Sequence, residues 1–304
     1  MLSEKNKIIL AIAAHEDNGN LDFFNKHIDT ISNLIVTITE RLTKEKVQIK
    51  RHEDYYEIHY FKFVFQTLSL KHLFEGTPLK AIKPDHSLHD LSTIYNSTRS
   101  LIETSITINY LYYNHKSDEQ AVFRYLLYIA GGLNNRQSYP ATIKENIEKR
   151  DFEKEEIQKI LTEIKSNTYF ISLHPHKQNS ILGRLHAFEN GIDQRITESG
   201  LDSDLFHTMW RLLSNYSHSE YIEAMQLIEY LNNISSHIGR IFSAYRICFM
   251  LNCYQIIKMT ERFDLAKTVF QEQSLETQTI IDFYNKLLLG IKLNVADNEV
   301  KAAE

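Results

Sequence analysis

An arginine and a histidine, Arg211 and His218, lie in the segment RLLSNYSHSE, which spans positions 211 to 220. Arginine binds phosphate oxygens through two parallel hydrogen bonds, and histidine is the side chain that most often moves a proton near neutral pH. Ser217 and Glu220 fit a capping box, which predicts that a helix begins here and places His218 in its first turn. The positive end of that helix favours a neutral histidine and offers backbone N–H groups to an anion. The segment therefore predicts phosphate chemistry at Arg211 and His218.

A purely structural interpretation of the same residues stands beside the chemical one. Polar residues are common where helices begin and end. On this interpretation Ser217 only caps a helix, His218 is solvated and Arg211 forms a surface ion pair. The segment would then be a polar hinge between two helices.

A second polar pair, Arg99 and Glu103, lies one helical turn apart in the segment STRSLIETS. With a rotation of about 100° per residue, both side chains lie off the apolar stripe of their predicted helix. They form either a surface ion pair or a polar pair that faces another helix and helps to build a site.

The chain contains fourteen histidines and two cysteines, but their spacing predicts no metal site. A di-iron bundle uses a glutamate followed three residues later by a histidine, and no glutamate of this chain has a histidine there. Cys248 and Cys253 lie on one predicted helix, give no zinc spacing and point too far apart to bridge each other. The sequence also lacks a Gly-rich phosphate loop. We therefore expect no metal and no cofactor.

The composition indicates a globular cytoplasmic protein. Of 304 residues, 43% are hydrophobic, which is enough for a full core. The formal net charge of -5 argues against a general nucleic-acid coat, so DNA is not an expected partner. No stretch reaches the roughly 18 uncharged apolar residues that cross a bilayer, so we expect no membrane partner either. Free cysteines indicate a reducing compartment.

Apolar residues recur at helical spacing along most of the chain, and only 4 prolines and 9 glycines interrupt them. This pattern predicts an all-α protein, an up-and-down helical bundle that forms a single domain over 1–304. The region 131–180 is the least regular and is expected to be an insertion, with a loop near its end at 166–180. Helices are predicted at 21–46, 54–74, 87–114, from 117 onward, 152–165, after 202, 217–263 and 275–293.

Six residues on the stripes of the two adjacent helices after position 202 are predicted to be buried. They are Trp210, Tyr216, Ile228, Leu231, Ile238 and Ile241.

Two stretches of this sequence resemble a known superfamily. An arginine followed after four to six residues by a histidine, within an all-helical bundle, is similar to the signature of the HEPN superfamily. YNSTRSLIETSITINYLY and WRLLSNYSHSE also resemble uncharacterised bacterial helical proteins often placed near it. The resemblance covers a HEPN-like core over 87–239 and leaves peripheral helices at both ends.

The resemblance implies that Arg211 and His218 are the motif pair and that Arg99 and Glu103 are the matching pair of the neighbouring helix. Ser214, Asn215 and Ser219, which flank the motif pair, are expected to help bind the substrate.

The function that this resemblance implies is that of a metal-independent endoribonuclease in RNA processing, in a toxin system or in phage defence, with RNA as the partner. One histidine cannot readily serve both ends of the reaction, so a homodimer is expected. Two alternatives remain open: a non-catalytic helical binding or scaffold protein, and a nucleotide- or small-ligand-binding bundle. Leu212 favours the non-catalytic alternative, because active members of the superfamily commonly have a polar residue after the arginine.

Overall fold

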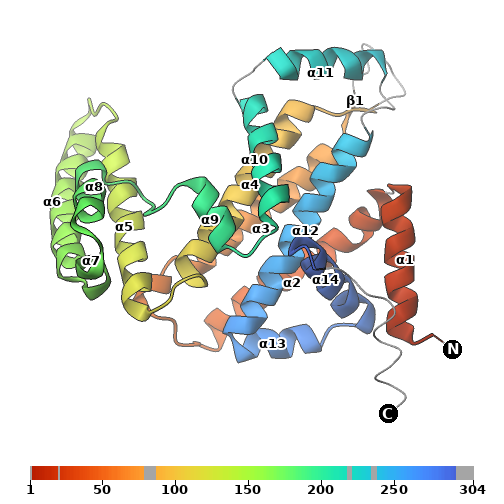
Figure 1. Cartoon of the computed structure of the whole chain (residues 1–304), viewed down its shortest axis with the longest axis horizontal. Coiled ribbons are helices and arrows are strands. Elements are labelled where there is room, and N and C mark those ends of the chain that lie inside the picture. Colours follow the sequence, from red (N-terminus) through yellow and green to blue (C-terminus); the bar gives the residue numbers. More distant parts are fainter. Residues whose placement is uncertain (1, 20, 79–86, 218–220, 234–237, 292–304) are drawn as a thin grey trace. The chain divides into compact units, whose positions relative to one another are not determined.

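The computed structural model describes residues 2–19, 21–78, 87–217, 221–233 and 238–291. Over these residues the chain forms fourteen α-helices, one 3-10 helix and one pair of two-residue strands (Figure 1). The predicted all-α class is confirmed. The antiparallel pair joins β1 (Thr77–Pro78) to β2 (Ser87–Leu88), with Thr77 opposite Leu88.

The chain divides into two compact units. Unit 1 comprises Met1–Val47, Glu57–Ile106 and Gly200–Glu304, and unit 2 comprises Gln48–Tyr56 and Thr107–Ser199. Whether the chain folds as the single domain expected from the sequence, with a core at 87–239 and an insertion at 131–180, stays a prediction.

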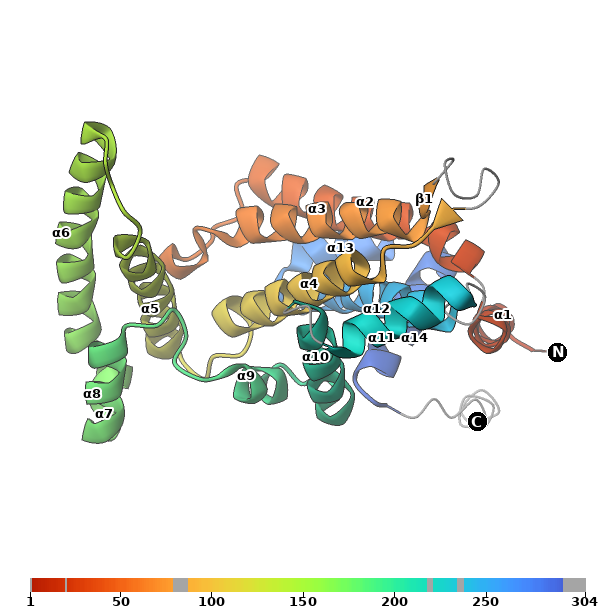
Figure 2. The same ribbon diagram turned by 90° about the horizontal axis from the view of Figure 1, so that it is seen from above.

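Unit 1 is built around one long apolar helix, α12 (Ile238–Arg262), which packs against α2, α13 and α14 (Figures 1 and 2). Its middle part is buried from Ile247 to Ile256. Both cysteines lie in this part and are free, as expected. The other elements of unit 1 are α1 (Glu4–Asn18), α2 (Leu21–Lys44), α10 (Ser203–Ser217), α11 (Tyr221–Asn232), α13 (Asp264–Gln271), α14 (Leu275–Leu288) and most of α3 (Tyr56–Phe74) and α4 (Leu91–Tyr112).

Two buried amides tie α12 to α3 and α4. Asn252 donates to Thr67 Oγ1 at 2.9 Å, and Gln255 donates to Ser105 Oγ at 2.8 Å. Tyr60 in turn donates to Gln255 Oε1 at 2.8 Å. A buried amide without partners would cost about 1–3 kcal/mol, so these bonds fix which residues of the three helices lie opposite one another. The position of α4, which carries Arg99 and Glu103, is set in this way.

Unit 2 contains a helical hairpin of α5 (Asp118–Gln137) and α6 (Lys144–Ser166), shown in yellow-green and green in Figure 1. The short helices α7 (Thr168–Ser172), α8 (Pro175–Arg184) and α9 (Ile192–Glu198) follow, and η1 (Arg51–Glu53) packs on α5. The apolar core of the unit includes Phe123, Leu127, Ile164 and Phe170.

A buried arginine organises the polar interior of unit 2. The side chain of Arg124 is 2% exposed. It donates to the carbonyl oxygen of Asn114 at 2.8 Å and to Glu198 at 3.0 Å, and its guanidinium lies 4.2 Å from the centre of the Tyr110 ring. A buried charge is tolerated only when it is paired and hydrogen-bonded in this way. Arg124 is therefore part of the structure of unit 2.

The predicted loop at 166–180 is wrong, because this segment contains α7 and most of α8. Asn167 caps α7 by accepting from the N–H of Phe170 at 3.1 Å. His174 caps α8 through its ring nitrogen, and Pro175 occupies the first turn, where its missing N–H costs nothing. The polar residues and the proline that favoured a loop therefore stand at the beginnings of two short helices.

The predicted long helix at 217–263 is also wrong. Ser217, the expected cap, is the last residue of α10, and α11 begins only at Tyr221. The pattern then divides between α11, which ends at Asn232, and α12, which begins at Ile238.

The predicted core of these helices is confirmed in part. Tyr216 and Ile241 are buried, whereas Trp210 is half-buried. The predicted burial is wrong for Ile228 and Ile238, whose side chains have exposed fractions of 61% and 51%. The side chain of Leu231 lies outside the described residues.

Candidate functional site

The Arg99–Glu103 pair of α4 contacts α10. Arg99 Nε donates to Glu103 Oε1 at 3.0 Å, as the one-turn spacing predicted. The indole Nε1 of Trp210, on α10, donates to the same carboxylate oxygen at 3.0 Å. The Arg99 guanidinium lies 5.0 Å from the centre of the Trp210 ring, within the range of a cation–π contact. Of the two interpretations of this pair, the structure therefore supports a polar pair that faces another helix.

A second set of contacts joins α4 to α10 two turns away. The ring of Tyr95 meets the ring of Tyr216 edge to face, with their centres 4.6 Å apart. Asn96 donates to the carbonyl oxygen of Tyr216 at 3.4 Å. Burial raises the pKa of Tyr95 to about 12, so this hydroxyl stays protonated and is not a base at neutral pH. The two sets of contacts fix α10 against α4.

Arg211 follows Trp210 directly and is exposed. Among the described residues, no carboxylate lies within ion-pair distance of its guanidinium, and no hydrogen bond joins it to Arg99 or Glu103. The structure therefore brings Arg99 and Glu103 together. Arg211, the residue after Trp210 on α10, has no anionic partner among the described residues.

The other predicted site residues lie at the end of α10. The hydroxyl of Ser214 donates to the carbonyl oxygen of Trp210 at 2.7 Å, and Asn215 is half-buried. His218 and Ser219 fall outside the described residues. The convergence of Arg211 with His218 stays a prediction.

Two residues were not predicted for this site. Trp210 is predicted to lie in the core, but its indole N–H donates to Glu103, and the ring is half-buried between α4 and α10. His207 precedes Arg211 by four residues on α10, so the two side chains project from one face of that helix. The spacing of His207 could have been found from the sequence, whereas nothing local links Trp210 to Glu103.

The described part of the chain gives no indication of a metal centre or a bilayer-spanning segment. No three histidine, cysteine, aspartate or glutamate side chains in it are grouped so that they could hold an ion. None of its helices combines the length and the apolar character that a membrane crossing requires.

Comparison with known proteins gives one family match. Residues 86–236 match DUF5677, a family described only as of unknown function. This segment runs from before α4 to beyond α11 and contains the whole Arg99–Glu103–Trp210 cluster together with Arg211. Neither the curated proteins nor the solved structures contain a match.

Proposed function

We propose that the α10–α11 junction binds RNA and cleaves it without a metal ion, in the manner of HEPN-like ribonucleases, with Arg211 and His218 as the reacting pair. The observation that carries this proposal is the exposed guanidinium of Arg211, which pairs with no carboxylate in the part of the chain that the structure describes and lies on a helix that the Trp210–Glu103 hydrogen bond holds against α4. An exposed guanidinium can bind an external phosphate through two parallel hydrogen bonds. Its fixed helix keeps the loss of conformational entropy on binding small.

The reaction uses the 2′-hydroxyl of RNA as its nucleophile. His218 removes the proton from the 2′-oxygen, which attacks the adjacent phosphorus; the new 2′-O–P bond forms as the bond from phosphorus to the 5′-oxygen breaks. Arg211 stabilises the charge that develops on the non-bridging phosphate oxygens. The departing 5′-oxygen takes a proton from a second acid, and the products are a 2′,3′-cyclic phosphate and a 5′-hydroxyl.

A symmetric dimer would supply that second acid from the His218 of the partner copy. Helix α11 supports this arrangement, because it follows the motif directly and exposes an apolar face. Tyr221, Met225 and Ile228 lie along this face, with exposed fractions of 79%, 44% and 61%. Buried Tyr230, whose hydroxyl accepts from the N–H of His89 at 2.6 Å, holds the opposite side of the helix. Packing two α11 faces together would bury the apolar residues and bring the two motif segments close to each other.

The test is cleavage of labelled RNA by the full chain in the presence of EDTA. His218→Ala should lower the rate about 100-fold or more, the usual size of an acid–base contribution, and Arg211→Ala should lower it comparably. Arg41→Ala is the matched control, because Arg41 is a partly exposed arginine of α2 that pairs with Glu272. Equal loss in the control, or no loss in either motif variant, would refute the assignment.

A non-catalytic helical binding protein is the second candidate. The exposed apolar face of α11 supports it independently of the motif, because self-association through that face requires no chemistry. Intact RNA in every condition, together with a dimer that depends on α11, would favour this candidate over the ribonuclease.

A further inference from the structure

Unit 1 has a groove between α3 and α4, in which an apolar wall with one lysine faces a wall of serines. Its cavity has a volume of about 720 Å³. Small-molecule sites typically enclose roughly 300–1,000 Å³. Ile58, Phe61, Lys62 and Phe65 line the groove from α3, and Ser97 and Ser100 line it from α4. No residue of the Arg99–Glu103–Trp210 cluster lines it, so the groove has to be explained separately.

The wall on α3 is an exposed apolar stripe. Ile58 and Phe65 lie on one face of the helix, with exposed fractions of 61% and 66%. The rings of Phe61 and Phe65 are nearly parallel, with an angle of 24° between their planes and 6.4 Å between their centres. The serines of α4 are too short to cover these rings. A flat aromatic surface therefore stays open along the groove.

A single cation interrupts this apolar stripe. Among the described residues that line the groove, Lys62 alone is charged. It lies one turn after Ile58 and one turn before Phe65, so apolar side chains flank it on the helix surface. No carboxylate of the described chain lies within ion-pair distance of its ammonium, whereas Lys71, further along the same helix, pairs with Asp29 at 2.7 Å. The groove therefore combines a positive charge with an apolar surface.

Ser100 adds a hydrogen-bond donor on the facing wall. Its Oγ accepts from Gln66 Nε2 at 2.8 Å, and its own O–H donates to no other group of the described chain. Gln66 follows Lys62 by one turn of α3, so this bond places Ser100 about one turn along α3 from the lysine. A carboxylate in this part of the groove would accept from both the ammonium and the hydroxyl, and such charge-assisted hydrogen bonds are the strong ones.

Charge argues against a second copy of the chain as the occupant. A symmetric contact centred on the α3 stripe would bring the Lys62 side chains of two copies together, and no carboxylate of the described chain lines the groove to separate them. A neutral apolar ligand would shield the ammonium from water without pairing it. An apolar anion satisfies both the stripe and the lysine.

We infer that this groove binds a small aromatic carboxylic acid in its anionic form, with the ring against Phe61 and Phe65 and the carboxylate on Lys62 and Ser100. Offset stacking on the exposed rings adds to the stabilisation from buried area. The inference does not rest on the proposed RNA chemistry, since none of these residues takes part in that reaction.

The experiment is isothermal titration of the full chain at low salt with naphthylacetate, with its neutral amide and with octanoate. Naphthylacetate should bind about tenfold more tightly than the amide, which forms no ion pair with Lys62, and about fivefold more tightly than octanoate, whose chain does not stack. Lys62→Gln should weaken naphthylacetate binding about tenfold and leave amide binding unchanged. Phe65→Ala should weaken binding of the acid and of the amide about fivefold.

Two matched control variants lie outside the groove. Lys44→Gln removes an exposed lysine of α2, and Phe152→Ala removes a phenylalanine of α6 that is 60% exposed. Both should bind naphthylacetate like the unaltered chain, and so should Arg211→Ala, because the α10 site is separate. Lys62 and Phe65 are themselves exposed, so substitutions there should leave the fold intact.

Three results would overturn the inference: no naphthylacetate binding at millimolar concentration, equal affinity for the acid and its amide, or equal weakening by Lys62→Gln and Lys44→Gln. If octanoate binds as tightly as naphthylacetate and Phe65→Ala changes neither, the assignment of an aromatic ligand is wrong. A dimer of the unaltered chain that Phe65→Ala dissociates would identify a second copy as the occupant instead.

Discussion

Trp210 Nε1 donates to Glu103 Oε1 at 3.0 Å and thereby joins two helices that lie more than a hundred positions apart in the chain. Arg99 binds the same carboxylate oxygen and lies over the indole ring, so one carboxylate holds both neighbours. Trp210 also precedes Arg211. The cluster is therefore best described as a support for the position of Arg211, and the three residues are positioning residues.

The hydrogen bond between Trp210 and Glu103 predicts a stability effect. Trp210→Phe keeps an aromatic ring beside Arg99 and removes the indole N–H. The free energy of unfolding should fall by about 1 kcal/mol, because the bond involves a charged acceptor but Glu103 is 42% exposed on its side chain. Chemical denaturation measures this value.

A double-mutant cycle with Glu103→Ala separates the bond from the loss of ring area. The two substitutions should be non-additive by about 0.5–1 kcal/mol. Strict additivity would mean that the bond contributes nothing to stability.

Two adjacent glycines of α5 give a matched pair of variants. A Cβ built on Gly131 would lie 2.2 Å from the backbone nitrogen of Ala187, whereas one built on Gly132 would meet nothing within 4 Å. Gly131→Ala should destabilise the chain by about 1–3 kcal/mol, since backbone has to move to make room. Gly132→Ala should stabilise it by about 0.5–1 kcal/mol, because alanine favours a helix interior.

Thermal unfolding of the two alanine variants checks this pair. The melting temperature should fall in the first and rise in the second. A fall of equal size in both would show that the close approach of Ala187 is not what requires glycine at position 131.

Burial of His59 predicts a pH dependence of stability. The buried site, together with neighbouring Lys62, lowers the pKa of His59 from 6.5 to about 4. Between these values the unfolded chain binds a proton at His59 that the folded chain does not. Stability should therefore be lost as the pH falls through this window, by up to about 3 kcal/mol.

The comparison that isolates this residue is the free energy of unfolding of the unaltered chain and of His59→Gln at pH 7 and at pH 5. The difference between the two pH values should be smaller in the variant. If both proteins lose the same stability on acidification, His59 is not the group responsible.

The helical class could be predicted from periodicity, because apolar residues at a spacing of 3.6 identify a helix wherever it lies. Periodicity does not identify which apolar side of a helix meets the core. Tyr221, Met225 and Ile228 form a regular stripe, yet α11 is held by Tyr230 on its other side and leaves the stripe exposed. The same stripe also runs on to Ile238 in the sequence, which led to one predicted helix where the structure has two.

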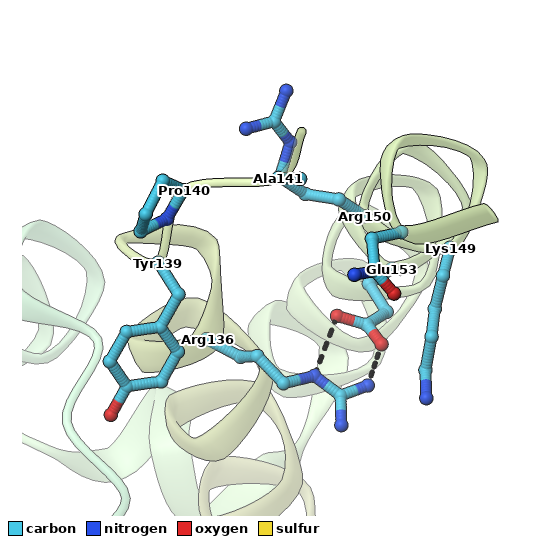
Figure 3. A pocket seen from close by; sticks show the side chains of 8 residues that line it. Arg136, Tyr139, Pro140, Ala141, Lys149, Arg150 and Glu153 are labelled. Atoms are coloured by element: carbon cyan, nitrogen blue, oxygen red, sulfur yellow. Dashed lines mark hydrogen bonds and ion pairs between the residues drawn. The ribbon is translucent and has the colours of Figure 1, made fainter. Parts of the chain in front are cut away.

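The candidate sites differ in how far the sequence could predict them. The Arg99–Glu103 ion pair is a local relationship and was predicted from its one-turn spacing. Its third member, Trp210, is a tertiary contact that no local pattern contains. The contact between Arg136 and Glu153 in unit 2 (Figure 3) was not predicted for another reason: Glu153 belongs to a helix rich in charged residues, and the sequence alone does not show that its side chain is buried against α5.

The exposed face of α11 predicts a dimer that a single charge should disrupt. Ile228 is 61% exposed, so Ile228→Lys should leave the free energy of unfolding of the monomer within about 0.5 kcal/mol of its original value. A lysine at the centre of an apolar dimer contact would be buried without a partner, and the dimer should dissociate. Leu227→Lys is the matched control, because Leu227 is 48% exposed but projects from a different side of α11. Sedimentation velocity should show dimers for the unaltered chain and for Leu227→Lys, and monomers for Ile228→Lys.

If the proposed ribonuclease needs two copies of His218, cleavage should be lost with the dimer and return at high concentration of Ile228→Lys. An unaltered chain that sediments as a monomer at tens of micromolar would rule out the dimer. The second proton would then have to come from the same chain. His207, which lies on the same face of α10 as Arg211, is the side chain to test for that role.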